Sequence, residues 1–360
     1  MNTRLIIIAS AVMAVALLAG CSGIGPKTIP RDRFNYSAAI SDSWQNQMLL
    51  NIVKLRYAET PVFVDVTSVI SQYAVEGQVN LGATFNNPLA GGSDTQSVGG
   101  TGKYTDRPTI TYAPLIGEKF AKTLMTPIPP PAVFFLIQAG WPVDFVFRSC
   151  IQSVNTIQNR SGSHVNRREA DPEFYRVVSL LRDIQKSGAV GMRIDLGKDK
   201  TEATVFTFRE RNIDPAVESK ISSVKRLLGL ESDRPEFRII YGSAPRNNME
   251  MAVLSRSILE IIVELSSYID IPEVHVAEGR SYATLFGQMD VSKEFGPLIE
   301  IHSQTDPPQD SYVSVRHRGY HFWIDDRDLR SKRMFSFIML LFTLVEPKAT
   351  LAPLVTIPTN

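Results

Sequence analysis

Apolar and polar residues change their spacing near the start of the chain. Between residues 34 and 57, apolar residues recur every three to four positions, which predicts an amphipathic helix. From residue 62 the period falls to two, which predicts strands at 62–70 and 73–85. Residues 86–105 are rich in Gly, Ser, Thr and Asn and are predicted to be a mobile loop. A further strand is predicted at 108–112.

The strand predicted at 73–85 has two unlike faces, and with the strand at 108–112 it predicts a β-hairpin over 73–112. About 9 to 11 alternating residues suffice for a tilted strand to cross an outer membrane. The apolar face therefore offers a candidate lipid-facing surface. An antiparallel pair on a soluble core would show the same alternation. The candidate membrane residues are Val75, Val79, Leu81 and Phe85.

Beyond this hairpin the patterns predict an α+β fold of mixed helices with short, mainly antiparallel sheets. The predicted helices are 116–125, 132–139, 142–157, 171–186, 215–228, 249–269 and a last helix that ends near Val345. The predicted strands are 190–196, 204–209, 237–241, 298–302, 311–316 and 320–324. Arg318-Gly319 between the last two predicts a hairpin turn. The polar stretch 160–170 divides a predicted N-terminal region, 34–165, from a C-terminal region, 166–360.

Near the start of the chain, Arg4 is followed by an apolar run that ends in Leu18-Ala19-Gly20-Cys21. This pattern is typical of a secretory signal, and its end resembles the lipobox of bacterial lipoproteins. The resemblance implies cleavage between Gly20 and Cys21, removal of the signal peptide 1–20 and lipidation of Cys21. A short transmembrane anchor and an ordinary signal peptide are the alternatives. Residues 21–33 are polar and rich in Gly and Pro, which predicts a tether.

By the same resemblance, Ser22 after the cysteine implies sorting to the outer membrane, with the protein facing the periplasm. Lys and Arg total 38 against 37 Asp and Glu, and this balance argues against a nucleic-acid partner. Cys21 would be used by the lipid, which leaves Cys150 as the second of two cysteines. We expect Cys150 to be a buried, unreactive thiol, because it shares a helical stripe with apolar residues.

Most catalytic signatures are missing from the sequence. It has no Gly-x-Ser-x-Gly elbow and no His-Glu-x-x-His pair, and Gly100-Thr101-Gly102-Lys103 matches a phosphate-binding loop poorly. A zinc site would need His302, His317 and His321 on one face. The acids Asp325 and Asp326 are interleaved with basic residues and fit a charged helix start. We therefore predict no catalytic residues, no metal and no cofactor.

Three functional hypotheses follow. The preferred one is a lipid-anchored, non-enzymatic envelope component that binds other envelope proteins in a structural or assembly role. The second is a subunit of an oligomeric outer-membrane pore or export channel, in which several copies each contribute the 73–112 hairpin. The third is a periplasmic hydrolase that uses Asp325, Asp326, His317 and His321. The expected partners are the membrane, other envelope proteins and, for a pore, further copies of the chain.

Overall fold

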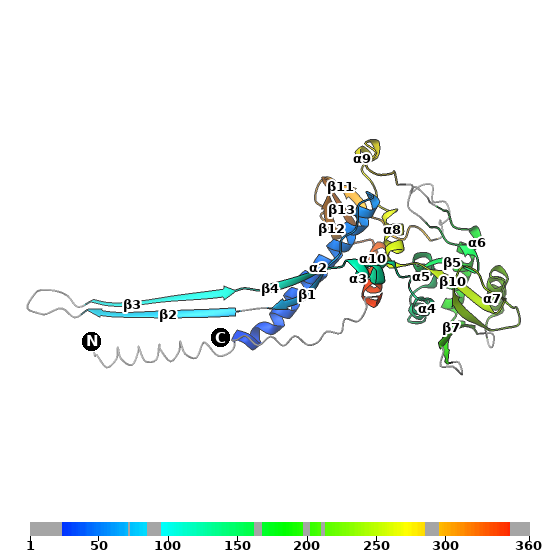
Figure 1. Cartoon of the computed structure of the whole chain (residues 1–360), viewed down its shortest axis with the longest axis horizontal. Coiled ribbons are helices and arrows are strands. Elements are labelled where there is room, and N and C mark those ends of the chain that lie inside the picture. The colour runs from blue at the N-terminus through cyan, green and yellow to red at the C-terminus, as the bar shows by residue number, and fades with distance from the viewer. Residues whose placement is uncertain are drawn as a thin grey trace, which may run out of the picture. The chain divides into compact units, whose positions relative to one another are not determined.

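The computed structural model describes residues 24–70, 73–84, 95–161, 168–196, 202–209, 213–284 and 295–345 (Figure 1). The fold is α+β with short, mainly antiparallel sheets, which confirms the predicted class. The chain divides into two compact units. The first unit consists of Met1–Trp44 and Val64–Pro114, and the second consists of Gln45–Phe63 and Leu115–Asn360.

The first helix, α2 (Ile24–Arg56), contributes residues to both units. It begins ten residues before the predicted start at 34, so most of the predicted tether 21–33 is helical. Pro26 and Pro30 misled the sequence interpretation, and Pro30 lies inside the helix, where it lacks the amide for one backbone hydrogen bond. Pro26 lies in the first turn, whose amide groups have no partner within a helix, so a proline costs little there. Towards the other end, Leu49, Ile52 and Val53 are fully buried in the second unit.

The first unit also contains four strands in two antiparallel pairs (Figure 1). The strand β1 (Val64–Ile70) pairs with β4 (Thr109–Pro114), and β2 (Tyr73–Thr84) pairs with β3 (Thr95–Asp106). The prediction of a loop over 86–105 is therefore wrong for 95–105, and the strand near 108–112 is not the partner of β2. Three glycines in β3 hid its period of two, because glycine has no side chain to mark a face.

The larger sheet of the second unit has six strands in the order β6-β5-β10-β9-β8-β7. Their bounds are β5 (Ile151–Val154), β6 (Ile157–Gln158), β7 (Val190–Leu196), β8 (Glu202–Phe208), β9 (Glu236–Tyr241) and β10 (Glu250–Ser255). Only β9 and β10 are parallel. The sheet combines strands from both sides of residue 165, so the predicted boundary between 34–165 and 166–360 would cut through one sheet.

Helices precede, connect or follow the strands of this sheet along the chain. They are α4 (Pro130–Gln138), α5 (Val143–Cys150), α6 (Pro172–Lys186), α7 (Pro215–Leu227) and α8 (Ile258–Ser266). Two predicted helices are too long, because α5 ends at Cys150 and the predicted helix 249–269 is β10 followed by α8. The break is explained by Ser257, which caps α8 in a reciprocal capping box with Glu260. Residues around 251–254 are apolar enough to fit either a buried strand or a helix.

A second sheet of three strands has the order β11-β13-β12. It consists of β11 (His302–Gln304), β12 (Ser311–His317) and β13 (Tyr320–Asp325), and α10 (Leu329–Val345) packs against β13. The predicted hairpin turn is confirmed, since Arg318 and Gly319 have φ angles of 50° and 90°. The short elements α3 (Gly117–Phe120), η2 (Ala121–Met125) and α9 (Glu273–Ala277) complete the unit. Among the described residues, no helix combines the length and the apolar character needed to cross a bilayer.

Candidate functional site

The β2–β3 pair, which we call the ribbon, is the candidate functional site. Its register is unbroken over twelve pairs, from Tyr73 opposite Asp106 to Thr84 opposite Thr95. Directly opposed residues share a face of the sheet. The first face therefore combines Tyr73, Val75, Gly77, Val79, Leu81 and Ala83 with Asp106, Tyr104, Gly102, Gly100, Val98 and Gln96. We call it the apolar face, because polar residues occur only at its ends.

The opposite face of the ribbon, the polar face, is made of small and hydrophilic residues. It combines Ala74, Glu76, Gln78, Asn80, Gly82 and Thr84 with Thr105, Lys103, Thr101, Gly99, Ser97 and Thr95. Glu76 and Lys103 are directly opposed and form an exposed ion pair with an N–O distance of 3.8 Å. The amide of Gln78 donates a hydrogen bond to Asn80 along the same strand.

Three of the four candidate membrane residues lie where the sequence predicts them relative to one another. Val75, Val79 and Leu81 are all in β2 and share the apolar face. Phe85 lies outside the described residues, as do Gly20 and Cys21 at the predicted cleavage and lipidation site. The sequence interpretation missed the contribution of β3, whose Val98 and Tyr104 extend the apolar face across the second strand. If the glycines of β3 are allowed on either face, Val98 and Tyr104 fall on the same face, and this pattern could have predicted the strand.

The end of the ribbon at Tyr73 and Tyr104 is tied to the beginning of α2. The two tyrosine rings stack with their centroids 6.3 Å apart. The Tyr73 hydroxyl donates a hydrogen bond of 2.5 Å to the Asp32 carboxylate. Hydrogen bonds with Tyr104, Asp32 and Tyr73 raise the pKa of Arg31. These contacts fix one end of the ribbon to a helix that begins at Ile24, three residues after Cys21.

The long edges of the ribbon have no partner strand among the described residues, because β2 and β3 form a sheet of only two strands. A strand edge presents a row of backbone N–H and C=O groups that can pair with another chain. An isolated two-stranded hairpin is at best marginally stable in water. The β1–β4 pair is also a sheet of two strands, and the ribbon differs from it in its greater length and unbroken register.

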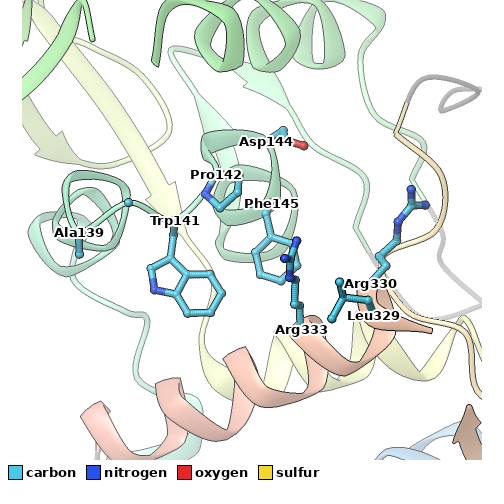
Figure 2. A pocket seen from close by; sticks show the side chains of 9 residues that line it. Ala139, Trp141, Pro142, Asp144, Phe145, Leu329, Arg330 and Arg333 are labelled. Carbon is cyan, nitrogen blue, oxygen red and sulfur yellow. The ribbon is translucent and has the colours of Figure 1, made fainter. Parts of the chain in front are cut away.

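The second unit contains a cavity of about 630 Å³ between the α4–α5 region and α10 (Figure 2). Trp141 and Phe145 form its aromatic wall, with ring centroids 5.8 Å apart. Arg330 and Arg333, one turn apart on α10, line it from the other side. The lining includes one carboxylate, Asp144, and no serine, cysteine or histidine. In the described part of the chain, this cavity therefore holds no nucleophile–base pair.

The residues of the hydrolase hypothesis contact different partners and not one another. His317 lies 3.2 Å from a Glu59 carboxylate oxygen, and Asp326 forms an ion pair of 2.6 Å with Lys332. The Asp325 carboxylate accepts from the backbone N–H of Arg327, which lowers the pKa of Asp325. His317, Asp325 and Asp326 each have a structural partner, and His321 lies opposite Arg316 in the β12–β13 ladder. They form no pair of acid and base facing a common space.

The three histidines considered for zinc do not gather either. In the β12–β13 hairpin His321 is opposite Arg316 and His317 is opposite Tyr320, so His317 and His321 are on different faces. Within the described ranges, no three His, Cys, Asp or Glu side chains come close enough to hold a metal ion.

Two buried polar contacts escaped the sequence interpretation. The Tyr57 hydroxyl and His275 Nδ1 are 2.7 Å apart in the core, and burial raises the pKa of Tyr57 to about 12 and lowers that of His275. Arg160, in the stretch predicted to be a boundary, is buried and forms an ion pair of 3.2 Å with Glu264. Both contacts join residues more than 100 positions apart, so no local sequence signal marks them.

Cys150 is fully buried at the end of α5, as predicted. Burial raises the pKa of its thiol to about 12, so the thiolate needed for reaction is scarce near neutral pH.

Comparison of the chain with family models, curated proteins and solved structures finds no match.

Proposed function

We propose that this chain is a lipid-anchored, non-enzymatic protein of the bacterial cell envelope, and that its ribbon assembles with strands of other protein chains. One observation carries the proposal: twelve residue pairs in unbroken register, with unlike faces and two open edges. Twelve residues is about twice the mean strand length of globular proteins. The absence of a nucleophile–base pair at the cavity is consistent with this role.

As far as the structure describes the chain, the ribbon lacks the contacts that normally stabilise a hairpin. Hairpins gain independent stability from a third strand or from packing of an apolar face against another element. The described residues provide neither to the ribbon beyond its tyrosine end. A partner would supply main-chain hydrogen bonds along an open edge, which is a common mode of strand addition.

The N-terminus gives this assembly its location. From the resemblance to lipoproteins we propose that Cys21 is lipidated and held at the outer membrane, facing the periplasm. Eight helical steps of 1.5 Å separate Ile24 from Asp32, a distance of about 12 Å. Asp32 in turn binds Tyr73 at the ribbon's end. The lipid and the ribbon's tyrosine end are therefore close in the same unit.

The test compares the full chain with a variant in which an Asn-Gly turn replaces residues 71–108, joining β1 directly to β4. We expect wild type, extracted from membranes in mild detergent, to migrate as a complex with other chains. The shortened variant should remain membrane-bound and folded but migrate alone. Its circular dichroism and thermal unfolding provide the folding control. The proposal is wrong if the shortened variant retains the same complex.

The anchor is tested separately with Cys21→Ser and metabolic labelling by a radioactive fatty acid. We expect label on wild type and none on the variant. Cys150→Ser is the matched control, because it removes the other cysteine and should leave labelling unchanged. Label on Cys21→Ser would contradict lipidation at this residue.

A further inference from the structure

We infer that the partner strands belong to other copies of this chain, and that the ribbons close head to tail into a ring-shaped sheet that crosses the membrane around an aqueous lumen. The apolar face contacts lipid and the polar face lines the lumen. This inference rests on the proposed assembly role and adds the identity of the partner and the result of the assembly.

The two open edges favour a ring over a simple dimer. If β2 of one copy pairs with β3 of the next, the antiparallel alternation of strands continues around the assembly and every edge finds a partner. A two-fold dimer that pairs β2 with β2 would leave both β3 edges open. Head-to-tail contacts that close into a ring remove all edges at once.

The charges on the polar face favour identical copies as neighbours. Glu76 on β2 and Lys103 on β3 lie at the same level of the ribbon. When β2 of one copy lies beside β3 of the next with the stagger of about two residues that tilted strands require, each Glu76 lies directly opposite its own Lys103 and diagonal to that of its neighbour, within reach of these long side chains. Acid and base then alternate around the ring, and no like charges are directly opposed. An unrelated strand would need a basic residue near Glu76 and an acidic residue near Lys103 to supply the same complementarity.

The length of the apolar face fits a bilayer. Eleven steps of 3.3 Å along β2 give about 36 Å, and a tilt of about 45° reduces the height to about 26 Å. The apolar band of an outer-membrane strand is about 25 Å tall. Tyr73 and Tyr104 stack at one end of the band, where aromatic residues gather at the membrane interface.

The polar face defines the chemistry of the lumen. Apart from Glu76 and Lys103, its residues are uncharged, and many are Gly, Ser or Thr. Each copy would contribute one charge of each sign to the wall. Such a lumen would be hydrated and weakly selective between cations and anions, which suits a passage for neutral or mixed-charge solutes.

The decisive experiment uses charge reversal in full-length copies. Glu76→Lys gives ribbons with two lysines, and Lys103→Glu gives ribbons with two glutamates. In a ring of one variant alone, like charges face each other both within and between copies. We expect roughly tenfold fewer detergent-extracted rings and channels for each variant, because each copy loses two attractive contacts and gains two repulsions. Rings are counted by native electrophoresis after crosslinking, and channels by conductance in planar bilayers.

Co-expression of the two variants separates contacts between copies from the contact within one ribbon. Alternating copies would restore the opposite-charge contacts between neighbours, although each ribbon still carries a like-charged pair. We expect rings and channels to recover to near wild-type numbers. The doubly reversed chain, with Glu76→Lys and Lys103→Glu together, is the folding control and should also assemble. A mixture that behaves like the single variants would overturn the ring.

The other outcomes distinguish this inference from the proposed function. If wild type is extracted with one copy bound to different proteins, the assembly role stands and the ring is wrong. If wild type is extracted alone as a monomer, both are wrong. If copies assemble but give no conductance in bilayers, the membrane-crossing lumen is wrong, since stacking of apolar faces would then explain the oligomer.

Discussion

Two antiparallel hairpins of this protein have the same topology and differ in what covers them. The β12–β13 hairpin has a third strand, β11, beside it, and its Val313, Phe322 and Ile324 are buried in the second unit. The ribbon has two strands, and its described side chains are mostly exposed: Tyr104, for example, is 56% exposed. The β12–β13 hairpin is completed by its own chain. We propose that the ribbon is completed by others.

The difference shows which interaction stabilises a hairpin. Both pairs form ladders of backbone hydrogen bonds, with one register shift in β12–β13 between Ser311 and Val313 and none in the ribbon. Such bonds replace bonds to water and contribute little net free energy. Burial of apolar surface is the larger favourable contribution. A two-stranded hairpin that buries little apolar surface therefore lacks most of this contribution unless another element or molecule covers one of its faces.

The largest expected effect contrasts one aromatic residue from each hairpin. Phe322→Ala removes a fully buried ring from β13 and should lower the free energy of unfolding of the second unit by about 3–5 kcal/mol. Tyr104→Ala in the ribbon should change it by less than about 0.5 kcal/mol, because the ring is exposed. Urea unfolding of the purified full chain, followed by circular dichroism, measures both. Equal losses for the two variants would show that the ribbon shares the core's stability.

The next effect tests the faces of the ribbon. A lysine at the bilayer midplane costs about 2–4 kcal/mol on the lipid face of an outer-membrane strand, whereas a lumen position tolerates charge. Val79→Lys should therefore abolish oligomers in membranes. Asn80→Lys, one residue away on the polar face, should retain them and shift the channel's selectivity towards anions. Neither variant should alter unfolding of the second unit. Loss of oligomers in both variants would mean that the two faces are equivalent.

Sequence patterns predict well where a period is carried by side chains. The predicted strand 190–196 coincides with β7, the helix 171–186 differs from α6 by one residue, and the Arg318-Gly319 turn is in place. The failures occur where side chains are small or the pattern is ambiguous. In β3 glycines erased the alternation, and at 249–269 an apolar run was compatible with both a strand and a helix.

The sequence predicted one strand of the candidate site and missed the other. Val75, Val79 and Leu81 follow from the alternation in β2, but the register with β3 and the attachment of Tyr73 to Asp32 do not. These contacts join segments that are distant in sequence, and their formation depends on how the chain closes its loops. The same reason hid Arg160 and Glu264. Polar contacts between residues distant in sequence can be identified only in the three-dimensional structure.

A smaller effect is the pH dependence of the free energy of unfolding, which should involve His275 and not the ribbon. Burial lowers the pKa of His275 below its usual 6.5, so the folded chain favours the neutral ring. As pH falls below about 6.5, the unfolded chain binds a proton that the folded chain resists, and stability decreases. We expect a lower free energy of unfolding at pH 5.5 than at pH 7, and a smaller difference in His275→Gln. An unchanged pH dependence in the variant would show that His275 is not responsible. Assembly through the ribbon should not follow this titration, since the described ribbon residues include no histidine.

The smallest effect concerns the tie between the ribbon and α2. Tyr73→Phe removes the hydroxyl that donates to Asp32 and keeps the ring that stacks on Tyr104. A hydrogen bond to a charged carboxylate contributes about 1.5 kcal/mol net at the lower end of its range, which corresponds to about tenfold faster amide exchange if the tyrosine end opens locally. Hydrogen exchange in the first residues of β2 should therefore accelerate in the variant, while exchange in β13 is unchanged. Tyr112→Phe is the matched control, because Tyr112 is 62% exposed in β4. Equal exchange in the two variants would show that the Asp32 contact does not hold this end of the ribbon. The two hairpins would then differ only in their covering and not in how each is attached to its unit.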